Sequence, residues 1–548
     1  MKRLALVLVA ASFAGGATAG TASSAHKPTT LCVGQRPGCY ASLQPAFDAA
    51  ADGDTIRIDP GTYAGGVTLD RSITVVGSGA GRTTISGGGP VLTIGVGGAV
   101  DADKLKVSLS GVTITGGVAT SVTTPDGPIT FVSAAGGVNI PSGDGTVGAT
   151  VTIRDSAITG NRSTPTSTVP DGDCPDGVTC AFAQAVAGGI ADVGRLTLVH
   201  TVVSDNVVGG GPTSSAAGGG IWTATNGGPG SLTLIDSTVS GNRAVAVAPN
   251  GRFADGGGIE VQDGEAFTVR NSTVSGNTAS VSNSYPSGVD MGANAGGIHI
   301  GGFGSATIEN TRIADNTASA DDPAGFPGAN DAGLAVIAGD FCDSPGDCGQ
   351  TLELRNSVIR GNHTIINASS SDNGPSVGAV EIDSQASVSN TLISDNTTTV
   401  TNSGSASAVG TFGAFDGGAS PIVVTNTIVR DNEVTVSSET GTATIEGSGI
   451  ANAGSLELHN SQITGNAAHA TGQDGFAQGG GIWNGQPFGP DGPTPLQLSL
   501  ENTHVTQNVL TGSAGVTLQG GGLYTFGFPV TLTSSVIANN VPDQCYGC

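Results

Sequence analysis

The chain has 548 residues, of which 90 are Gly, 4% are aromatic and 11% are charged, and its formal net charge is −25 at pH 7. So small a charged fraction is not that of a disordered chain, and the Gly content suits a fold with many tight corners. The acidic balance disfavours nucleic acid and anionic membranes as partners. It also disfavours a polyanionic polysaccharide, unless calcium bridges the two.

The N-terminus has the three parts of a secretory signal peptide. Lys and Arg at 2–3 form the charged start, residues 4–14 form the apolar core, and small residues at 17–19 or 23–25 offer a cleavage site. No other apolar run reaches the ~18 residues of a membrane helix. We expect residues 1–25 to be removed and the protein to be secreted or loosely attached to the cell surface. Four Lys against fifteen Arg favour a bacterial source.

The eight Cys residues fall into four local pairs, which in an exported chain indicates disulfides. A metal site is the weaker interpretation, because no second Cys or His pair lies at zinc-ligand spacing beside any of them. Each bond would close a short loop and stiffen it locally. The expected pairs are Cys32 with Cys39, Cys174 with Cys180, Cys342 with Cys348, and Cys545 with Cys548.

Residues 26–53 form a leader and a short helix ahead of the repeats. The segment SLQPAFDAAA at 42–51 places Leu43, Ala46 and Phe47 on one side of a helix. An open end of a repeat array exposes unpaired strand edges and core side chains. We therefore expect this helix to cover the first coil.

The pattern SLTLIDSTVSGN at 231–242 recurs eleven times, at intervals of 32 to 46 residues. Every copy ends in Asn, with Val or Ile three residues before it and Ser or Thr five residues before it. Such a period is typical of solenoids, in which each unit buries its apolar face only against its neighbours. The copies end at Asn161, Asn206, Asn242, Asn277, Asn316, Asn362, Asn396, Asn432, Asn466, Asn508 and Asn540.

Each unit is predicted to contain three short strands. Alternation at 232–234 indicates a strand with one buried face, Val239 begins a second, and a Gly pair followed by an aliphatic residue, as at 257–259, begins a third. The β-branched residues and Gly exclude paired helices. We predict an all-β chain in which residues 54–548 form a single right-handed parallel β-helix of roughly twelve coils, stacked about 4.8 Å apart.

The eleven terminal Asn residues are predicted to form an internal ladder. Each buried amide would bond to the equivalent amides above and below it, as in stacked cross-β structures. An unpaired buried amide would cost about 1–3 kcal/mol. Asn also tolerates the left-handed backbone that a sharp corner needs. We therefore assign these residues a structural role and no catalytic one.

The GGGI element followed by aliphatic-x-x-Asn resembles the paired repeats of the polymorphic outer-membrane protein family, which usually has Phe where this chain has Val or Ile. The whole is also similar to the pectin-lyase-like superfamily of right-handed parallel β-helices. The entry segment DGDTIRIDPGTYAGGVTLDRSITVVGSG at 52–79 strengthens the second resemblance. That resemblance implies the fold and a helix over its open end. It also admits action on polysaccharides as a lyase or glycoside hydrolase.

The sequence varies most between each Asn and the next Gly pair, as at 162–187 and 278–295. We expect these polar segments to be loops along one side of the rod, where recognition usually occurs. Two of them carry the acidic turns DGDCPDG and CDSPGDC. The acidic residues of these turns make calcium a candidate ligand, but the turns lack the twelve-residue pattern of an EF-hand. We therefore expect no cofactor.

One column of residues carries the candidate site. The residue after the inward aliphatic of each Gly-pair strand points away from the core by alternation, and both Trp residues of the protein fall there. Exposed aromatic rings beside carboxylates suit sugars, whose ring faces stack and whose hydroxyl groups bond to acids. The column reads Asn139, Ala191, Trp222, Glu260, His299, Ala335, Glu381, Ala451, Trp483 and Tyr524, with the coil near Phe412 unassigned. The predicted ligand-binding residues are Trp222, Glu260, His299, Glu381, Trp483 and Tyr524.

Weak catalytic candidates in this column are Glu260, Glu381 and Asp383. Glu260 and His299 are expected on adjacent coils about 5 Å apart. Glu381 and Asp383 should lie roughly 7 Å apart, within the ~6.5–9.5 Å of an inverting glycosidase pair. Acids two residues apart are also ordinary on a β-helix. The superfamily resemblance implies that a lyase would use an outward Arg or Lys as its base, and the column contains neither.

Three functions follow as alternatives. The one we favour is recognition of a glycan or a cell surface without chemistry. The second is a polysaccharide lyase or glycoside hydrolase, and the third is a purely structural solenoid. The oligomeric state does not follow from the sequence.

Overall fold

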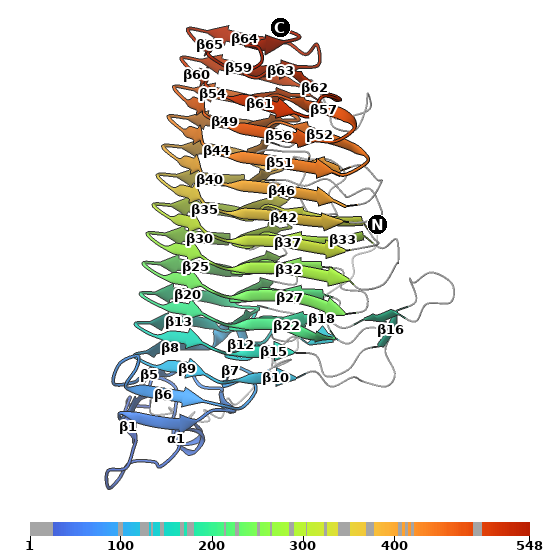
Figure 1. Ribbon diagram of the computed structural model, residues 1–548. Helices are drawn as coiled ribbons and strands as arrows, with labels where there is room; N and C mark the ends of the chain where they lie inside the picture. Colours follow the sequence, from blue (N-terminus) through green and yellow to red (C-terminus); the bar gives the residue numbers. More distant parts are fainter. Residues whose placement is uncertain are drawn as a thin grey trace, which may run out of the picture.

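The computed structural model is a parallel β-helix whose coils stack from the N-terminal to the C-terminal end (Figure 1). The predicted signal peptide and the two acidic turns fall wholly or partly outside the described residues. Those residues are 26–96, 102–120, 131–132, 135–142, 147–164, 169–171, 180–182, 184–212, 215–224, 230–248, 253–262, 266–283, 290–302, 304–322, 326–337, 351–368, 378–403, 408–410, 415–417, 421–485 and 496–548.

Three long sheets enclose the main core. In a middle coil, β25 (Ser231–Ile235) belongs to sheet A, β26 (Thr238–Ser240) to sheet B and β29 (Ile259–Gln262) to sheet C. Each strand pairs in parallel with its equivalents in the neighbouring coils. Sheet A has fifteen strands and sheets B and C have fourteen each. The rod is longer than the roughly twelve coils expected, because three coils without the Asn pattern precede the eleven that carry it.

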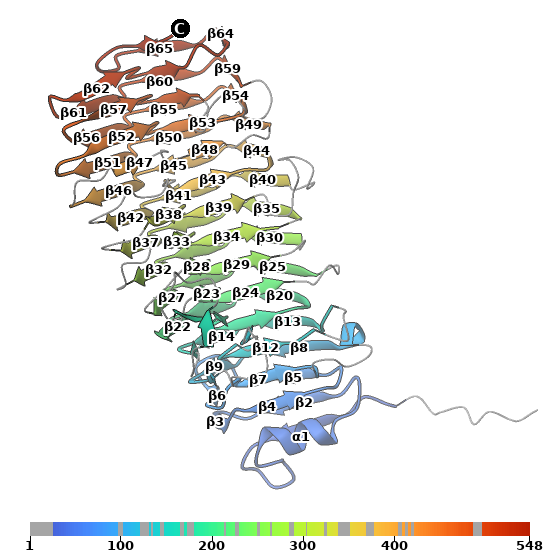
Figure 2. The same cartoon turned by 90° about the vertical axis from the view of Figure 1, so that its right-hand side faces the viewer.

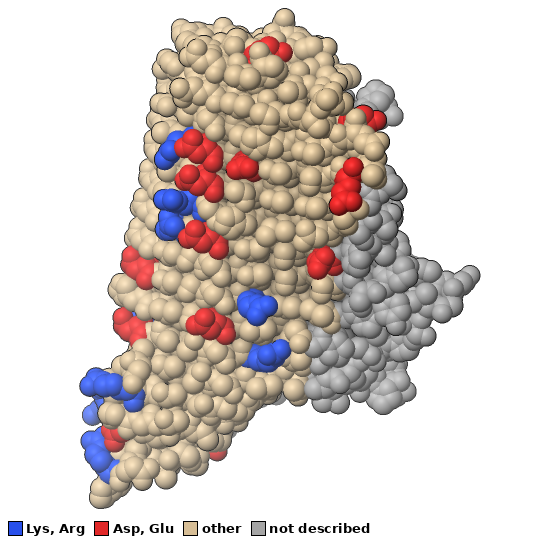
Figure 3. Space-filling model, viewed as in Figure 1, with Lys and Arg blue, Asp and Glu red and all other residues tan. Residues whose placement is uncertain are grey.

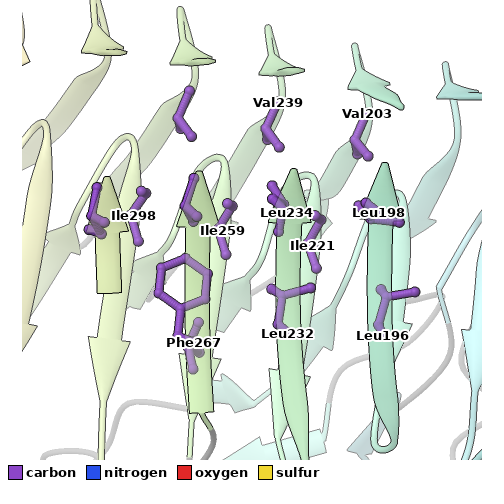
Figure 4. Packing of buried hydrophobic residues seen from close by; sticks show 14 of the residues in the cluster. Leu196, Leu198, Val203, Ile221, Leu232, Leu234, Val239, Ile259, Phe267 and Ile298 are labelled. Carbon is purple, nitrogen blue, oxygen red and sulfur yellow. The ribbon is translucent and has the colours of Figure 1, made fainter. Parts of the chain in front are cut away.

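The main core consists of aliphatic side chains stacked coil on coil. Leu232 and Leu234 of β25 are fully buried, and their equivalents one coil earlier, Leu196 and Leu198, lie directly beside them (Figure 4). Phe267 fills the same column in the next coil. Alternation of Leu and Thr in the sequence thus becomes alternation between core and surface.

The sharp corners of each coil are made by residues that precede the ladder Asn residues, and not by the ladder Asn residues themselves. Asp236, Asn271 and Asn310, six residues before successive ladder Asn residues, have φ of about 50°. The residue immediately before each ladder Asn also has positive φ, as in Gly241 with φ 65°. The ladder Asn residues have no positive φ, so the left-handed role expected of them was wrong. The preference of Asn, Asp and Gly for this conformation explains the flanking residues instead.

The eleven Asn side chains form a continuous buried ladder. Asn242 donates from its backbone N and its Nδ2 to Oδ1 of Asn277, both at 3.0 Å, and Asn277 does the same to Asn316 at 3.0 Å. Nδ2 of Asn242 also donates to the carbonyl of Val203 at 3.0 Å. At the end of the ladder, Oε1 of Gln544 accepts from N and Nδ2 of Asn540. The amide stack is therefore closed within the chain.

The repeated Ser or Thr five residues before each Asn forms a second ladder. The backbone N of Ser237 donates to Oγ of Ser272 at 3.1 Å, and Oγ of Ser237 donates to the carbonyl of Ile235 at 2.8 Å. Both Ser residues are buried. The hydroxyl groups thus satisfy backbone groups at a corner where strand pairing is interrupted.

The segments between each Asn and the next Gly pair are strands as well as loops. After Asn277, β32 (Thr278–Asn283) leaves the corner and β33 (Asp290–Asn294) returns. Such outgoing strands form sheet D, and the returning ones form sheets E and G. Ala279, Val281 and Ala293 pack between them in a second core. The loops expected at 162–187 and 278–295 were therefore partly wrong, because Ala alternating with Ser and Thr gives only a weak hydrophobic pattern.

The candidate site lies on sheet C, and sheets E and G contain the returning strands of the same coils. The strands of sheet C are β4 (Val67–Leu69), β7 (Leu92–Ile94), β12 (Val138–Ile140), β19 (Ile190–Asp192), β24 (Ile221–Ala224), β29, β34 (Ile298–Gly301), β39 (Leu334–Ile337), β43 (Val380–Ile382), β48 (Phe415–Gly417), β53 (Ile450–Asn452), β58 (Ile482–Asn484), β63 (Leu523–Thr525) and β66 (Cys545–Tyr546). Those of sheet E are β11 (Phe131–Val132), β18 (Gln184–Val186), β23 (Ser215–Ala217), β28 (Phe253–Asp255), β33 and β38 (Phe326–Asn330). Sheet G contains β47 (Ala408–Gly410), β52 (Thr442–Glu446), β57 (Asp474–Gln478) and β62 (Val516–Gln519).

The N-terminal end of the rod is covered as predicted. Helix α1 (Leu43–Ala49) buries Leu43, Ala46 and Phe47 against the first coils (Figure 1). The helix therefore shields the first coil from water, as the amphipathic pattern at 42–51 indicated.

Two of the four predicted disulfides join described residues. Cys32 and Cys39 are bonded beside α1, with Cα atoms 4.7 Å apart, and Cys545 and Cys548 are bonded at the opposite end of the rod.

The other two predicted bonds fall outside the described residues. They were expected between Cys174 and Cys180, and between Cys342 and Cys348. Cys174, Cys342 and Cys348 are not described, and Cys180 is described only as the backbone start of strand β17 (Cys180–Phe182). The structure therefore neither confirms nor corrects the pairing of Cys180 or that of Cys348, and both bonds stay predictions.

Candidate functional site

The structure stacks the predicted column in the expected order along sheet C. Register pairs Trp222 with Glu260, Glu260 with His299, His299 with Ala335 and Ala335 with Glu381. In the coil left unassigned near Phe412, Phe415 takes the inward position and Asp416 the column position. No Gly pair precedes Phe415 in the sequence, which is why the pattern missed it. The sheet C column thus runs from Asn139 to Tyr524.

The column is not the exposed face that alternation predicted. Glu260, Trp483 and Tyr524 are buried, and Trp222 and His299 are half-buried. The returning strands β28, β33 and β38 lie alongside sheet C and form an inner corner with it (Figure 2). A Cβ on Gly218 would lie 2.6 Å from Cβ of Trp222, so the turn between the sheets closely approaches the column. The second core, which the sequence did not predict, is what buries Glu260 and leaves Trp222 and His299 only half-exposed.

A buried ion pair occupies the middle of this inner corner. Nδ1 of His299 lies 2.8 Å from Oε2 and 3.0 Å from Oε1 of Glu260, whose side chain is 0% exposed. Nε2 of Gln262 donates to Oε1 of Glu260 at 3.1 Å. The adjacent-coil contact predicted between Glu260 and His299 is therefore present, and the carboxylate is held on both oxygens.

Acidic neighbours set the charge of His299. Burial lowers the pKa of this imidazole, but the charge and hydrogen bond of Glu260, with the charges of Asp255 and Glu381, raise it to about 9. Burial and the charge of Glu260 raise the pKa of Asp255 to about 7. Nδ2 of Asn294 donates to Oδ1 of Asp255 at 2.9 Å. His299 is thus an imidazolium at neutral pH, and Asp255 gains or loses its proton there.

Glu381 and Asp383 lie two coils further along the column. Only Ala335 separates Glu381 from His299 in the register, so the column has a small side chain between two charged ones. Burial and the charge of Glu381 raise the pKa of Asp383 to about 7. Asp383 therefore keeps a proton at a pH where ordinary carboxylates hold none.

Four polar atoms of the column have no hydrogen-bond partner among the described residues. They are Oδ1 of Asn139, Nε1 of Trp222, Nε2 of His299 and Oε2 of Glu381, and each is buried. Successive members of this line are spaced two coils apart, which is about 10 Å at the ordinary strand spacing. A buried polar atom without a partner costs about 1–3 kcal/mol. The corner is therefore a line of hydrogen-bonding groups that the described chain does not itself satisfy.

The upper part of the column is an aromatic core. Trp483 and Tyr524 cluster with Ala451, and Tyr546 stacks on Tyr524 with ring centroids 5.5 Å apart. A Cβ on Gly485 would lie 2.5 Å from the Trp483 ring. These two predicted ligand-binding residues are thus packed against protein and contribute to a satellite core.

The sign of the pH dependence follows from these shifts. The pKa of His299 is raised above 6.5, so its contribution to stability is complete below pH 6.5 and is lost as the pH rises through about 9. Asp255 and Asp383 have pKa values raised from 3.8 to about 7, so their contribution is lost between about pH 4 and 7. We expect the melting temperature to fall from pH 5 to pH 9.

NMR should show the His299 ring titrating near 9 in the wild type and below 6.5 in Glu260→Gln. Titration of wild-type His299 near its ordinary value would contradict the ion pair.

Comparison with solved structures found several chains that align with this one at low identity. The A-module of mannuronan C-5 epimerase AlgE6 of Azotobacter vinelandii aligns over 90% of this chain and 93% of its own, with 14% identity and a TM-score of 0.31. An alginate lyase of a Paenibacillus species aligns over 66% and 94%, with 13% identity and a TM-score of 0.24. PfbA, a surface adhesin of Streptococcus pneumoniae, aligns over 76% and 86%, with 12% identity and a TM-score of 0.21.

The parallel pairing of its own strands makes this chain a parallel β-helix, and the resemblance to the pectin-lyase-like superfamily stays a prediction. No family model and no curated protein matches the sequence. The resemblance to polymorphic outer-membrane repeats therefore stays a prediction. Within the described ranges, no helix is long and apolar enough to cross a membrane. The same residues contain no group of three or more His, Cys, Asp or Glu side chains placed to hold a metal ion.

Proposed function

We propose that the protein is an exported, non-enzymatic β-helix that recognises a neutral glycan along the inner corner beside Trp222, His299 and Glu381. The observation that carries this proposal is the line of buried polar atoms without partners among the described residues, in which Trp222, His299 and Glu381 follow Asn139. A glycan supplies hydroxyl groups that both donate and accept, at regular intervals along an extended chain. The indole N–H and the imidazolium N–H would donate to it, and the Glu381 carboxylate would accept from it.

Charge favours a neutral ligand over an acidic one. The corner holds the carboxyl groups of Glu260, Asp255, Glu381 and Asp383 against the cation of His299. A uronate chain would bring like charge into a site of low dielectric, where repulsion is strong. That repulsion favours a hydroxyl-rich polymer without carboxylates. The face of the rod drawn in Figure 3, which is the face seen in Figure 1, carries its acids and bases in small groups among uncharged residues.

The state of Glu260 favours binding over cleavage. A general acid or base must reach the proton that it transfers, whereas both oxygens of Glu260 face His299 and Gln262 and the side chain is buried. The predicted signal peptide at 1–25 supports export. Trp222, Glu260, His299 and Glu381 lie in one corner, while Trp483 and Tyr524 would act only by packing the column above them.

The test is affinity electrophoresis of the wild type through soluble neutral and acidic polysaccharides. We expect retardation by at least one neutral polymer and none by polyuronates. Trp222→Ala should weaken binding at least tenfold, since it removes a stacking face and a donor. Val202→Ala, in an exposed position of the same coil on sheet B, should leave binding unchanged. Equal retardation of both variants would rule out the corner as the site.

A second candidate is an inverting glycoside hydrolase that uses Glu381 and Asp383. The observation that favours it is the pKa of Asp383, raised to about 7 beside Glu381, because a general acid must hold its proton near neutral pH. Their spacing of roughly 7 Å along one strand fits that mechanism. Release of reducing ends that Glu381→Gln abolishes would establish this function in place of recognition.

A further inference from the structure

The unsatisfied polar atoms of the sheet C column recur with a period of two coils. They belong to Asn139, Trp222, His299 and Glu381, and each atom is buried without a hydrogen-bond partner in the part of the chain that the structure describes. Six successive register pairings join Asn139 to Glu381, so the line covers about 29 Å. The column crosses the stacked strands of sheet C and therefore follows the axis of the rod (Figure 2). A ligand that satisfies all four atoms must be extended in that direction.

The residues on the intervening coils keep this period intact. Ala191 and Ala335 are buried and have no polar side-chain atoms. The third intervening residue is Glu260, whose two carboxylate oxygens are already held by His299 and Gln262. Unused hydrogen-bonding groups therefore occur on every second coil, about 10 Å apart.

This period selects the linkage of the glycan. In a β-1,4-linked chain with equatorial bonds, each sugar is flipped relative to the one before it, so the same edge of the ribbon returns with every second sugar. Two sugars of such a chain are nearly as long as two coils of the rod, which is about 10 Å. An α-1,4-linked chain winds into a helix instead, so its hydroxyl groups soon leave a straight line of protein groups.

The four groups also suit the hydroxyl groups on one edge of such a ribbon. Nε1 of Trp222 and Nε2 of the His299 imidazolium are donors, whereas Oδ1 of Asn139 and Oε2 of Glu381 are acceptors. A hydroxyl group both donates and accepts, so one edge of a uniform chain can satisfy all four. The recognised chain therefore needs no substituent other than hydroxyl groups at these positions.

We propose that the inner corner binds an extended, neutral β-1,4-linked glycan that lies along the rod and places every second sugar against Asn139, Trp222, His299 and Glu381. The bound stretch is about seven sugars long, because the four groups contact its first, third, fifth and seventh sugars. This inference rests on the proposed function and adds the linkage, orientation and length of the ligand. It also adds Asn139, which belongs to the column but was not among the predicted ligand-binding residues.

Isothermal titration calorimetry with β-1,4-linked gluco- and manno-oligosaccharides of about two to nine units tests the proposal. We expect the affinity of at least one series to increase at three, five and seven units and to stay constant beyond seven. Each even-length chain should bind no better than the chain one unit shorter, since it reaches no further group. α-1,4-linked gluco-oligosaccharides of the same lengths should show no such steps.

Asn139→Ala tests the length of the site. It should lower the affinity of the seven-unit chain about fivefold, to that of the five-unit chain, and leave the three-unit chain unchanged. The matched control is Thr93→Ala, because Thr93 pairs with Asn139 one coil earlier and is also half-buried, yet lies outside the two-coil period. This control should bind every chain as the wild type does.

The possible outcomes separate this inference from the proposed function. Binding of an α-linked or branched neutral glycan that Trp222→Ala abolishes, without length steps in the β-1,4-linked series, would overturn the linkage and leave glycan recognition standing. Equal effects of Asn139→Ala and Thr93→Ala would overturn the two-coil period. Failure to bind any neutral glycan would overturn the proposed function as well.

Discussion

Replacing Asn316 with Ala is expected to destabilise the middle of the rod by about 4 kcal/mol, because it leaves two buried donors without an acceptor. Oδ1 of Asn316 accepts from the backbone N and from Nδ2 of Asn277 at 3.0 Å each, in a region closed to water. Removal of the amide also opens a small cavity at the corner. Urea unfolding followed by circular dichroism should show the loss, and the backbone amide of Asn277 should exchange with solvent much faster.

The matched control is Asn310→Gly in the same coil. Asn310 lies at an exposed corner with φ 49°, and Gly accepts that conformation without strain. We expect a change of about 0.5 kcal/mol or less, since surface substitutions away from special features have small effects. Equal effects of the two variants would mean that the ladder amides contribute no more than surface ones.

Replacing His299 with Ala is expected to cost about 3–5 kcal/mol at pH 7, because a buried carboxylate loses its cation. Glu260 would keep only the bond from Gln262, and its side chain is fully buried. The cost should shrink at pH 5, where the stranded carboxyl can take up a proton. Melting curves of the variant and the wild type across pH 5 to 8 measure both effects.

The double variant Glu260→Leu with His299→Leu separates the charge from the packing. Replacing both members of a buried ion pair by apolar residues of similar volume is often neutral. We expect most of the loss in His299→Ala to be recovered, and the part of the pH dependence that comes from the His299 imidazolium to disappear. A double variant as unstable as the single one would place the effect in side-chain shape rather than in charge.

The sequence predicted the parts of this molecule that repeat. Leu232 and Leu234 alternate with Thr, and Asn242 recurs at a fixed offset from them, so the strand faces and the ladder follow from pairing rules alone. The order of the column from Trp222 through Glu260 to His299 followed in the same way, because parallel coils place equivalent positions side by side.

What the sequence could not predict depends on contacts between different segments. The second core is lined by residues such as Ala279 and Ala293, whose small side chains give little hydrophobic signal. Without it the column looks exposed, and so Glu260 was expected in water rather than in a buried ion pair. The pattern that could have revealed the second core is the alternation of Ala and Val with Ser and Thr at 278–283, directly after Asn277.

The central claim is that the inner corner binds a glycan without breaking it. The most direct test is to incubate the protein with each polysaccharide that it retains, and then to assay for reducing ends and unsaturated sugars. We predict that the polymer is recovered intact and that binding is lost in Trp222→Ala. Steady release of sugar products by the wild type, abolished in Glu381→Gln, would contradict the account.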